Sequence, residues 1–143
     1  MSVVSAAPVR AGPRALERIL DSGRPALIVF ESRGCAPCES LAPVLEALAG
    51  EFAQRVTVVR VDARQAWLAA RHHLSYVPTL VFYDHGRERA RIKGNPGAEA
   101  VRSYLEFLVA GGEPPDPAEG PRHTLVLGFA RGRARTRAPV VKW

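Results

Sequence analysis

The chain has 143 residues, of which 47% are apolar and 24% charged, which is typical of one globular domain and excludes a disordered chain. No apolar run approaches the roughly 20 residues that span a bilayer, so we expect no membrane span. The net charge of +6 comes from residues 120–143, which hold six basic residues and no acidic one, whereas residues 1–119 hold 14 of each sign. The balanced part of the chain therefore gives no reason to expect nucleic-acid binding.

The spacing of apolar residues predicts alternating helices and strands along the chain. The run at 26–30 is continuously apolar, as in a strand that is buried on both faces. Residues 84–87 form the predicted turn of a hairpin. This order of elements predicts an α/β fold, in which a mixed sheet is flanked by helices and ends in an antiparallel hairpin. We expect helices over 14–22, 36–50, 64–73 and 98–109, and strands over 26–30, 55–61, 79–83 and 88–93.

The C-terminal part of the chain differs in composition from the rest. Residues 113–121 contain four prolines and are predicted to be a linker, and residues 122–143 form a basic tail. Within the tail, 123–129 could add one more strand, in this copy or in a neighbouring one. The arginines of the tail favour a solvated segment over a site for an acidic partner, a lipid or RNA. We therefore divide the chain into a domain of residues 1–112, with its core at about 14–110, the linker and the tail.

The two cysteines, Cys35 and Cys38, lie three positions apart where a predicted strand turns into a helix. The free N–H groups and the dipole at a helix N-terminus favour a thiolate, so they lower the pKa of Cys35 and activate it as a nucleophile. Cys38 lies one helical turn further on and is close enough to form a disulfide with Cys35. Structural zinc needs four ligands, and no second cysteine pair or suitably spaced histidine pair is present, so redox chemistry is favoured over a metal site or an inert pair.

Residues 1–12 lack the charged and apolar regions of a secretory signal, which predicts a cytoplasmic location. A cysteine pair in a reducing compartment is more often catalytic than a structural crosslink. Val77-Pro78-Thr79 adds a second feature, since it comes directly before a predicted strand and its Val–Pro bond is a candidate for the cis form.

At these motifs the sequence resembles the thioredoxin family, over roughly residues 14–110. The resemblance implies a thioredoxin fold in which Pro78 is cis and packs beside Cys35. It also implies that Val77 offers backbone groups to an extended substrate segment, with Gly34 bordering the same surface. The shared elements, in family order, are the strand 27–30, Cys35-Ala36-Pro37-Cys38, the helix proline Pro43, Asp62 at the end of a strand, Val77-Pro78-Thr79, Gly86 and Gly94.

Several positions depart from the family pattern. Gly34 replaces a tryptophan and Ala36 replaces a glycine. The family's buried aspartate and its lysine partner correspond to Val29 and Val58, so both charges are lost together, which avoids a lone buried charge. Glu31 is the nearest candidate replacement for the lost proton acceptor, or a group that tunes the pKa of Cys35. The alternative is that Glu31 is a solvated residue at the rim.

The sequence thus predicts a thiol–disulfide oxidoreductase, an enzyme that reduces protein disulfides through Cys35 and Cys38. We expect it to act as a monomer and to need no metal or organic cofactor. A thioredoxin-reductase-like enzyme or a low-molecular-weight thiol would recharge it. The alternative is a binding or assembly factor, or a redox sensor, with the same fold and a dedicated partner. The missing buried charges and the basic tail favour this alternative, whereas Cys35, Cys38 and Pro78 favour catalysis.

Overall fold

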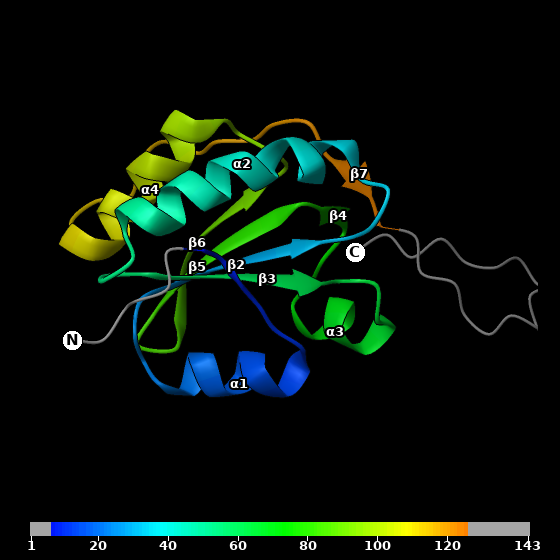
Figure 1. The fold of residues 1–143 in the computed structure, drawn as a ribbon, viewed down its shortest axis with the longest axis horizontal. Coiled ribbons are helices and arrows are strands. Elements are labelled where there is room, and N and C mark those ends of the chain that lie inside the picture. The colour runs from blue at the N-terminus through cyan, green and yellow to red at the C-terminus, as the bar shows by residue number, and fades with distance from the viewer. Residues whose placement is uncertain (1–6, 126–143) are drawn as a thin grey trace, which may run out of the picture.

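The computed structural model describes residues 7–125 and contains a central mixed sheet with helices on both faces (Figure 1). The strand order is β1-β3-β2-β5-β6. The first three of these run parallel, β5 is antiparallel to β2, and β6 is antiparallel to β5. The bounds are β1 Val9–Arg10, β2 Ala26–Glu31, β3 Thr57–Asp62, β5 Thr79–Asp84 and β6 Arg87–Lys93.

Two helices cover each face of the sheet. Helices α2 (Ala36–Glu51) and α4 (Ala98–Ala110) lie on one face, and α1 (Pro13–Asp21) and α3 (Ala66–Arg71) lie on the other (Figure 1). None of the described helices is long and apolar enough to cross a membrane. The arrangement confirms the predicted α/β class with a mixed sheet flanked by helices.

The central strand β2 is buried along its whole length, as its continuous apolar run predicts. Alternate residues of β2 belong to two apolar clusters, one on each face of the sheet. Ile28 and Phe30 belong to the cluster on the α1 and α3 side, and Leu27 and Val29 belong to the cluster on the α2 and α4 side. Because β2 is anchored on both faces, the turn that follows it is held at a fixed position at the carboxyl end of the strand.

Helix α2 begins directly after that turn. Pro37 stands in its first turn, where a missing N–H leaves no bond unmade, and Pro43 lies inside the helix. The helix packs on the sheet through a stripe of buried leucines at helical spacing, Leu41, Leu45 and Leu48. This packing fixes the N-terminus of α2 above the ends of β2 and β3.

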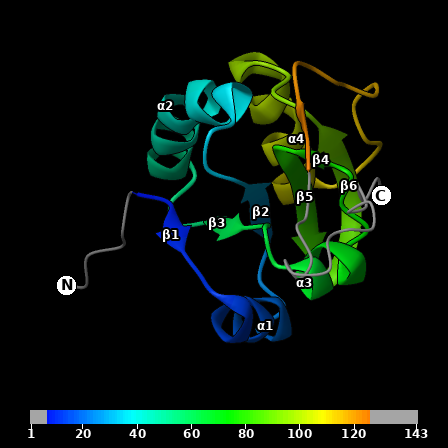
Figure 2. The same cartoon turned by 90° about the vertical axis from the view of Figure 1, so that its right-hand side faces the viewer.

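The structure adds two short strands that the sequence patterns do not predict, and a third at the start of the segment 123–129 for which a strand was suggested. Strand β1 extends the parallel edge of the sheet. Strands β4 (Tyr76–Val77) and β7 (His123–Thr124) form a separate antiparallel pair, which lies beside the start of α2 (Figures 1 and 2). The helix expected over 64–73 is shorter, because only Ala66–Arg71 is helical. Of the strand suggested at 123–129, residues 126–129 lie outside the described residues, as does the rest of the basic tail.

The proline-rich segment between α4 and β7 runs across the domain and is bonded to it at several points. The Tyr104 hydroxyl donates to the Asp116 carbonyl at 2.8 Å. The Gly120 N–H donates to the Lys93 carbonyl at 3.2 Å, and the Asn95 N–H donates to the Pro121 carbonyl at 2.9 Å. The segment therefore delivers β7 to the carboxyl end of the central strands.

Candidate active site

Cys35 and Cys38 form a disulfide at the start of α2. Cys35 is the residue that caps the helix, and its extended backbone conformation directs the side chain back over the first turn. The Cys38 N–H donates a hydrogen bond to Cys35 Sγ at 3.2 Å, and the two Cα atoms are 5.2 Å apart. The predicted pair is thus present in its oxidised form, with Cys35 receiving a backbone hydrogen bond that would also stabilise a thiolate.

The loop before β5 lies against Cys35. The Val77–Pro78 peptide bond is cis, and the Val77 carbonyl oxygen lies 3.7 Å from Cys35 Sγ. The loop is held from both sides, because the Thr79 hydroxyl donates to the Tyr76 carbonyl at 2.7 Å and the Gly94 N–H donates to the Pro78 carbonyl at 2.7 Å. The structure therefore brings together Cys35, Val77 and Pro78, three residues that the sequence analysis placed in one site.

Gly34 lies on the exposed side of the same site. Its φ of +74° lies in the left-handed region, which a side chain would disfavour, although a Cβ there would meet no atom within 4 Å. The conformation of the turn, and not a lack of space, accounts for glycine at this position. Gly34 and Cys38 border a hollow of about 430 Å³, whose other lining residues include Glu31, Arg60, Arg10 and Arg33.

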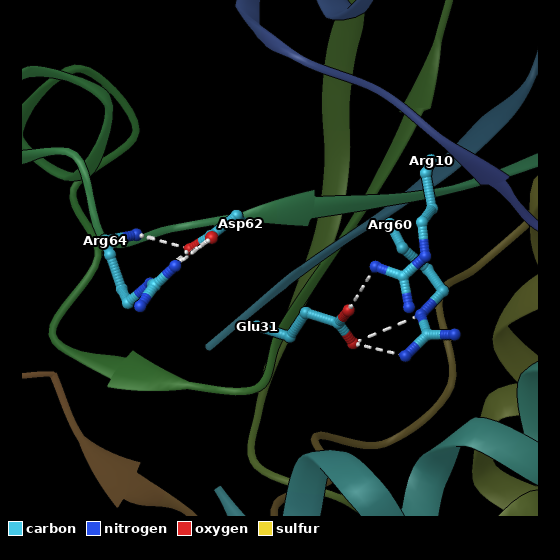
Figure 3. Close-up of polar contacts among 5 residues, drawn as sticks. All are labelled: Arg10, Glu31, Arg60, Asp62 and Arg64. Carbon is cyan, nitrogen blue, oxygen red and sulfur yellow. Dashed lines mark hydrogen bonds and ion pairs between the residues drawn. The ribbon is translucent and has the colours of Figure 1, made fainter. Parts of the chain in front are cut away.

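Glu31 is buried in this hollow and paired with two arginines, as Figure 3 shows. Arg60 Nε and Nη2 both donate to Glu31 Oε1, at 3.2 and 3.1 Å, and Arg10 Nη1 lies 3.6 Å from Oε2. The Glu31 side chain is 11% exposed and that of Arg60 17%, whereas that of Arg10 is 72% exposed. Glu31 is therefore a buried, ion-paired acid and not a solvated rim residue.

Arg60 and Arg10 were not predicted as part of the site. Val29 and Val58, the positions of the acid–base pair in the resemblance, are buried in the apolar cluster. Glu31 and Arg60 each lie two residues further along the same two parallel strands, so they share a face of the sheet with those valines. The signal that could have found Arg60 is a single arginine inside an otherwise apolar strand, in the sequence Thr57-Val58-Val59-Arg60-Val61.

A second ion pair at the same end of β3 is exposed (Figure 3). The Arg64 guanidinium donates to both carboxylate oxygens of Asp62, at 2.8 to 3.2 Å, and this bonding lowers the pKa of Asp62. Both side chains are about half exposed, at 50% and 56%. This pair lies beside the site and is a surface counterpart of the buried Glu31–Arg60 pair.

Cys35 has no exposed surface, and Cys38 is 4% exposed. Among residues 7–125, no three His, Cys, Asp or Glu side chains are grouped as metal ligands. What the arrangement can do chemically is thiol–disulfide exchange, in which a thiolate attacks a disulfide and one of its two sulfurs leaves.

Comparison with known proteins agrees with this chemistry. A thioredoxin-like protein of Synechocystis is 29% identical over 94 residues, which cover 65% of this chain and 90% of that protein. The thioredoxin of Mycobacterium tuberculosis is 35% identical over 92 residues, which cover 64% of this chain and 79% of that protein. A solved thioredoxin variant from Halobacterium salinarum superposes with a TM-score of 0.71 at 23% identity, covers 79% of this chain and all of its own, and supports the fold.

The family profile named Thioredoxin matches residues 14–107. This span is more than half of the chain, and it contains the Cys35–Cys38 disulfide as well as the Val77–Pro78 bond. On these grounds the chain belongs to the thioredoxin family.

Proposed function

We propose that this protein reduces disulfides in other proteins through the dithiol form of Cys35 and Cys38. The observation that carries the proposal is the Cys35–Cys38 disulfide at the N-terminus of α2, with the Val77 carbonyl 3.7 Å from Cys35 Sγ. The thioredoxin family already indicates thiol–disulfide oxidoreductase chemistry. The direction of the reaction and the class of substrate are the parts proposed here.

The reaction takes place in two exchanges. The Cys35 thiolate attacks one sulfur of the substrate disulfide, which forms a mixed disulfide and releases the other substrate sulfur as a thiolate. The Cys38 thiolate then attacks Cys35 Sγ, which breaks the mixed disulfide and releases the second substrate sulfur. Two electrons pass to the substrate, which takes up two protons, and the chain is left with the Cys35–Cys38 disulfide that the structure contains.

The N-terminus of α2 assists the first exchange. The Cys38 N–H that donates to Cys35 Sγ in the disulfide is directed at the atom that carries the negative charge in the thiolate. The proposed substrate-binding residues are Val77, Pro78 and Gly34. Gly34 leaves the surface beside the sulfurs free of a side chain, and Val77 offers backbone groups to an extended segment.

The oxidised protein must be recharged by a reductant of the dithiol or thiol class. A thioredoxin-reductase-like enzyme or a low-molecular-weight thiol meets this requirement, because either can attack the disulfide and supply two electrons. The reaction needs no metal or organic cofactor on this chain, and the proposed working form is a monomer. A cytoplasmic location stays a prediction from the sequence.

Glu31 is proposed to assist Cys38 in the second exchange. Glu31 and Cys38 line the same hollow, and the carboxylate is held there by Arg60 and Arg10. In this role it would replace the proton acceptor that is absent at Val29. Because Glu31 would act on the proton of Cys38 without forming a bond to substrate, it is a positioning residue and not a nucleophile.

We expect Glu31→Gln to lower the rate of insulin reduction by about tenfold and to change the shape of its dependence on pH, since the amide cannot accept a proton. The control is Glu46→Gln, which removes an exposed acid of α2 that does not line the hollow. Rates measured from pH 5 to 9 test this role. A Glu31→Gln profile that overlays the wild type would show that Glu31 has no part in the exchange.

The proposed function itself is tested by insulin reduction in the presence of dithiothreitol. The reduced B chain of insulin precipitates, so turbidity measures the rate. A rate clearly above that of dithiothreitol alone supports the proposal. A folded wild-type protein that adds nothing to the rate of dithiothreitol contradicts it.

A further inference from the structure

The sulfur proposed to attack substrate is closed to solvent. Cys35 is 0% exposed, yet the proposed exchange needs a second sulfur to reach it in line with the bond that breaks. One segment that pairs with β4 beside Cys35 lies outside residues 14–107, the span that the family profile matches. It comprises residues 119–125, and we call it the strap.

The strap occupies the free backbone edge of the loop that precedes Pro78. Strand β7 pairs antiparallel with β4, so that His123 lies opposite Val77 and Thr124 lies opposite Tyr76. The Leu125 N–H extends the pairing by donating to the Ser75 carbonyl at 3.0 Å. The strap therefore uses the same backbone edge that the proposed function reserves for an extended substrate.

Leu125 anchors the strap in the apolar core. Its side chain is only 2% exposed, and it belongs to the same apolar cluster as Cys35, Cys38 and Val77. The cluster that contains the disulfide therefore also contains an aliphatic side chain of the strap. The backbone pairing and the buried leucine are two independent features of the strap that match what an extended peptide substrate would provide.

At the start of the strap, the backbone of Gly120 lies very close to the backbone of Gly94 and Asn95. Gly94 has a φ of +92°, and a Cβ on it would collide with the Gly120 carbonyl. A Cβ on Gly120 would collide with the Asn95 carbonyl in turn. Glycine at both positions permits the bonds from Gly120 N–H to Lys93 and from Asn95 N–H to Pro121. The strap is therefore held at two places, by close backbone contacts at Gly120 and by the buried side chain of Leu125.

The end of the strap nearest the disulfide is held by few groups. Its ladder with β4 has two residue pairs, and His123 and Arg122 are exposed. The Arg122 guanidinium lies 4.7 Å from the centre of the Tyr76 ring and pairs with Glu119 at 3.0 Å. A two-stranded pair of this length is marginal on its own, so Leu125 is the main apolar anchor. Such a segment can open locally without unfolding the domain.

We propose that the strap is an intramolecular substrate mimic that shuts the dithiol site and must leave before Cys35 can react. An extended peptide segment that pairs with β4 and places an aliphatic side chain where Leu125 lies would displace it. This inference rests on the proposed function and deepens it, because it names a gate and a substrate class for the same site. Substrates without such a segment would meet a closed site.

The test is the rate at which dithiothreitol reduces the Cys35–Cys38 disulfide of the full-length protein. Dithiothreitol attacks one sulfur, displaces the other as a thiol and then cyclises, so the rate reports access to the disulfide. Leu125→Asp should speed this reduction by about tenfold or more, because the charged side chain loses the burial that holds the strap closed. Val109→Asp is the matched control at an exposed position of α4, and its rate should equal that of the wild type.

Acid quenching followed by alkylation and mass measurement gives the fraction reduced at each time. Leu125→Ala keeps the segment uncharged and should speed reduction in the same direction by a smaller factor, so the test survives if Leu125→Asp does not fold. Circular dichroism checks the fold of each variant. Equal reduction rates for wild type and both folded Leu125 variants would show that the strap does not control access to the disulfide.

The same set of variants separates the gate from the proposed function. Faster reduction by dithiothreitol in Leu125→Asp, with no insulin reduction by any form, would keep the gate and reject the proposed function. Insulin reduction by the wild type, with equal dithiothreitol rates in all variants, would keep the function and reject the gate.

Discussion

Replacing Cys35 with serine should reduce the catalysed part of insulin reduction by at least about 10³-fold, to the rate of dithiothreitol alone. A serine hydroxyl is not ionised near neutral pH and cannot form the mixed disulfide on which both exchanges depend. The side chain is nearly the same size and is fully buried in the wild type, so the fold should survive. Turbidity of insulin measured with and without the variant gives the catalysed rate.

The matched control for Cys35→Ser is Ala47→Ser, which adds the same hydroxyl to an exposed position of the same helix. It should leave the rate of insulin reduction unchanged. A Cys35→Ser variant that retained the wild-type rate would show that the sulfur does not carry the reaction. That result would favour a binding or assembly factor, for which the cysteine pair is dispensable.

Replacing Arg60 with methionine should lower the free energy of unfolding by about 2–3 kcal/mol, a large part of the roughly 5–15 kcal/mol of a typical domain. Arg60 makes two hydrogen bonds to one oxygen of Glu31, which is buried. Its loss would leave that carboxylate with Arg10, whose side chain is mostly exposed. Urea unfolding followed by circular dichroism measures the change.

Two further variants isolate the cause. Arg64→Met breaks the exposed pair with Asp62 and should lower the free energy of unfolding far less than Arg60→Met does, because water screens an exposed pair. Adding Glu31→Leu to Arg60→Met should recover most of the loss, because an apolar pair leaves no buried charge without a partner. If Arg60→Met were as mild as Arg64→Met, the Glu31–Arg60 pair would be screened by water and would contribute little to stability.

The elements that the sequence predicted well are those whose pattern is local. Helix α2 shows a leucine stripe at helical spacing, and β2 is one continuous apolar run, so both could be placed to within a residue or two. The short strands β1 and β4 have two residues each and no period to detect, whereas β7 lies at the start of the segment 123–129 for which the sequence suggested a strand without naming its partner. They exist because other strands supply their hydrogen-bond partners, and that information is not contained in their own sequence.

The candidate site also contains some residues that local sequence predicts and others that only the fold brings together. Cys35 and Cys38 are three residues apart, so local spacing was enough to pair them. The Glu31–Arg60 pair joins two strands and depends on their parallel register, which composition does not encode. The packing of the strap could not be predicted, because Gly120 and Pro121 are typical of a linker and the backbone fit depends on distant residues.

In the proposed exchange Cys35 attacks the substrate and Cys38 resolves the intermediate. The most direct test of these two roles is to mix reduced Cys38→Ser protein with insulin, quench in acid and measure mass without reducing agent. The proposed exchange predicts a covalent adduct of one protein chain with one insulin molecule, which dithiothreitol removes, and no such adduct with Cys35→Ser. An adduct that forms on Cys35→Ser and not on Cys38→Ser would contradict the account, because Cys38 would then be the attacking sulfur.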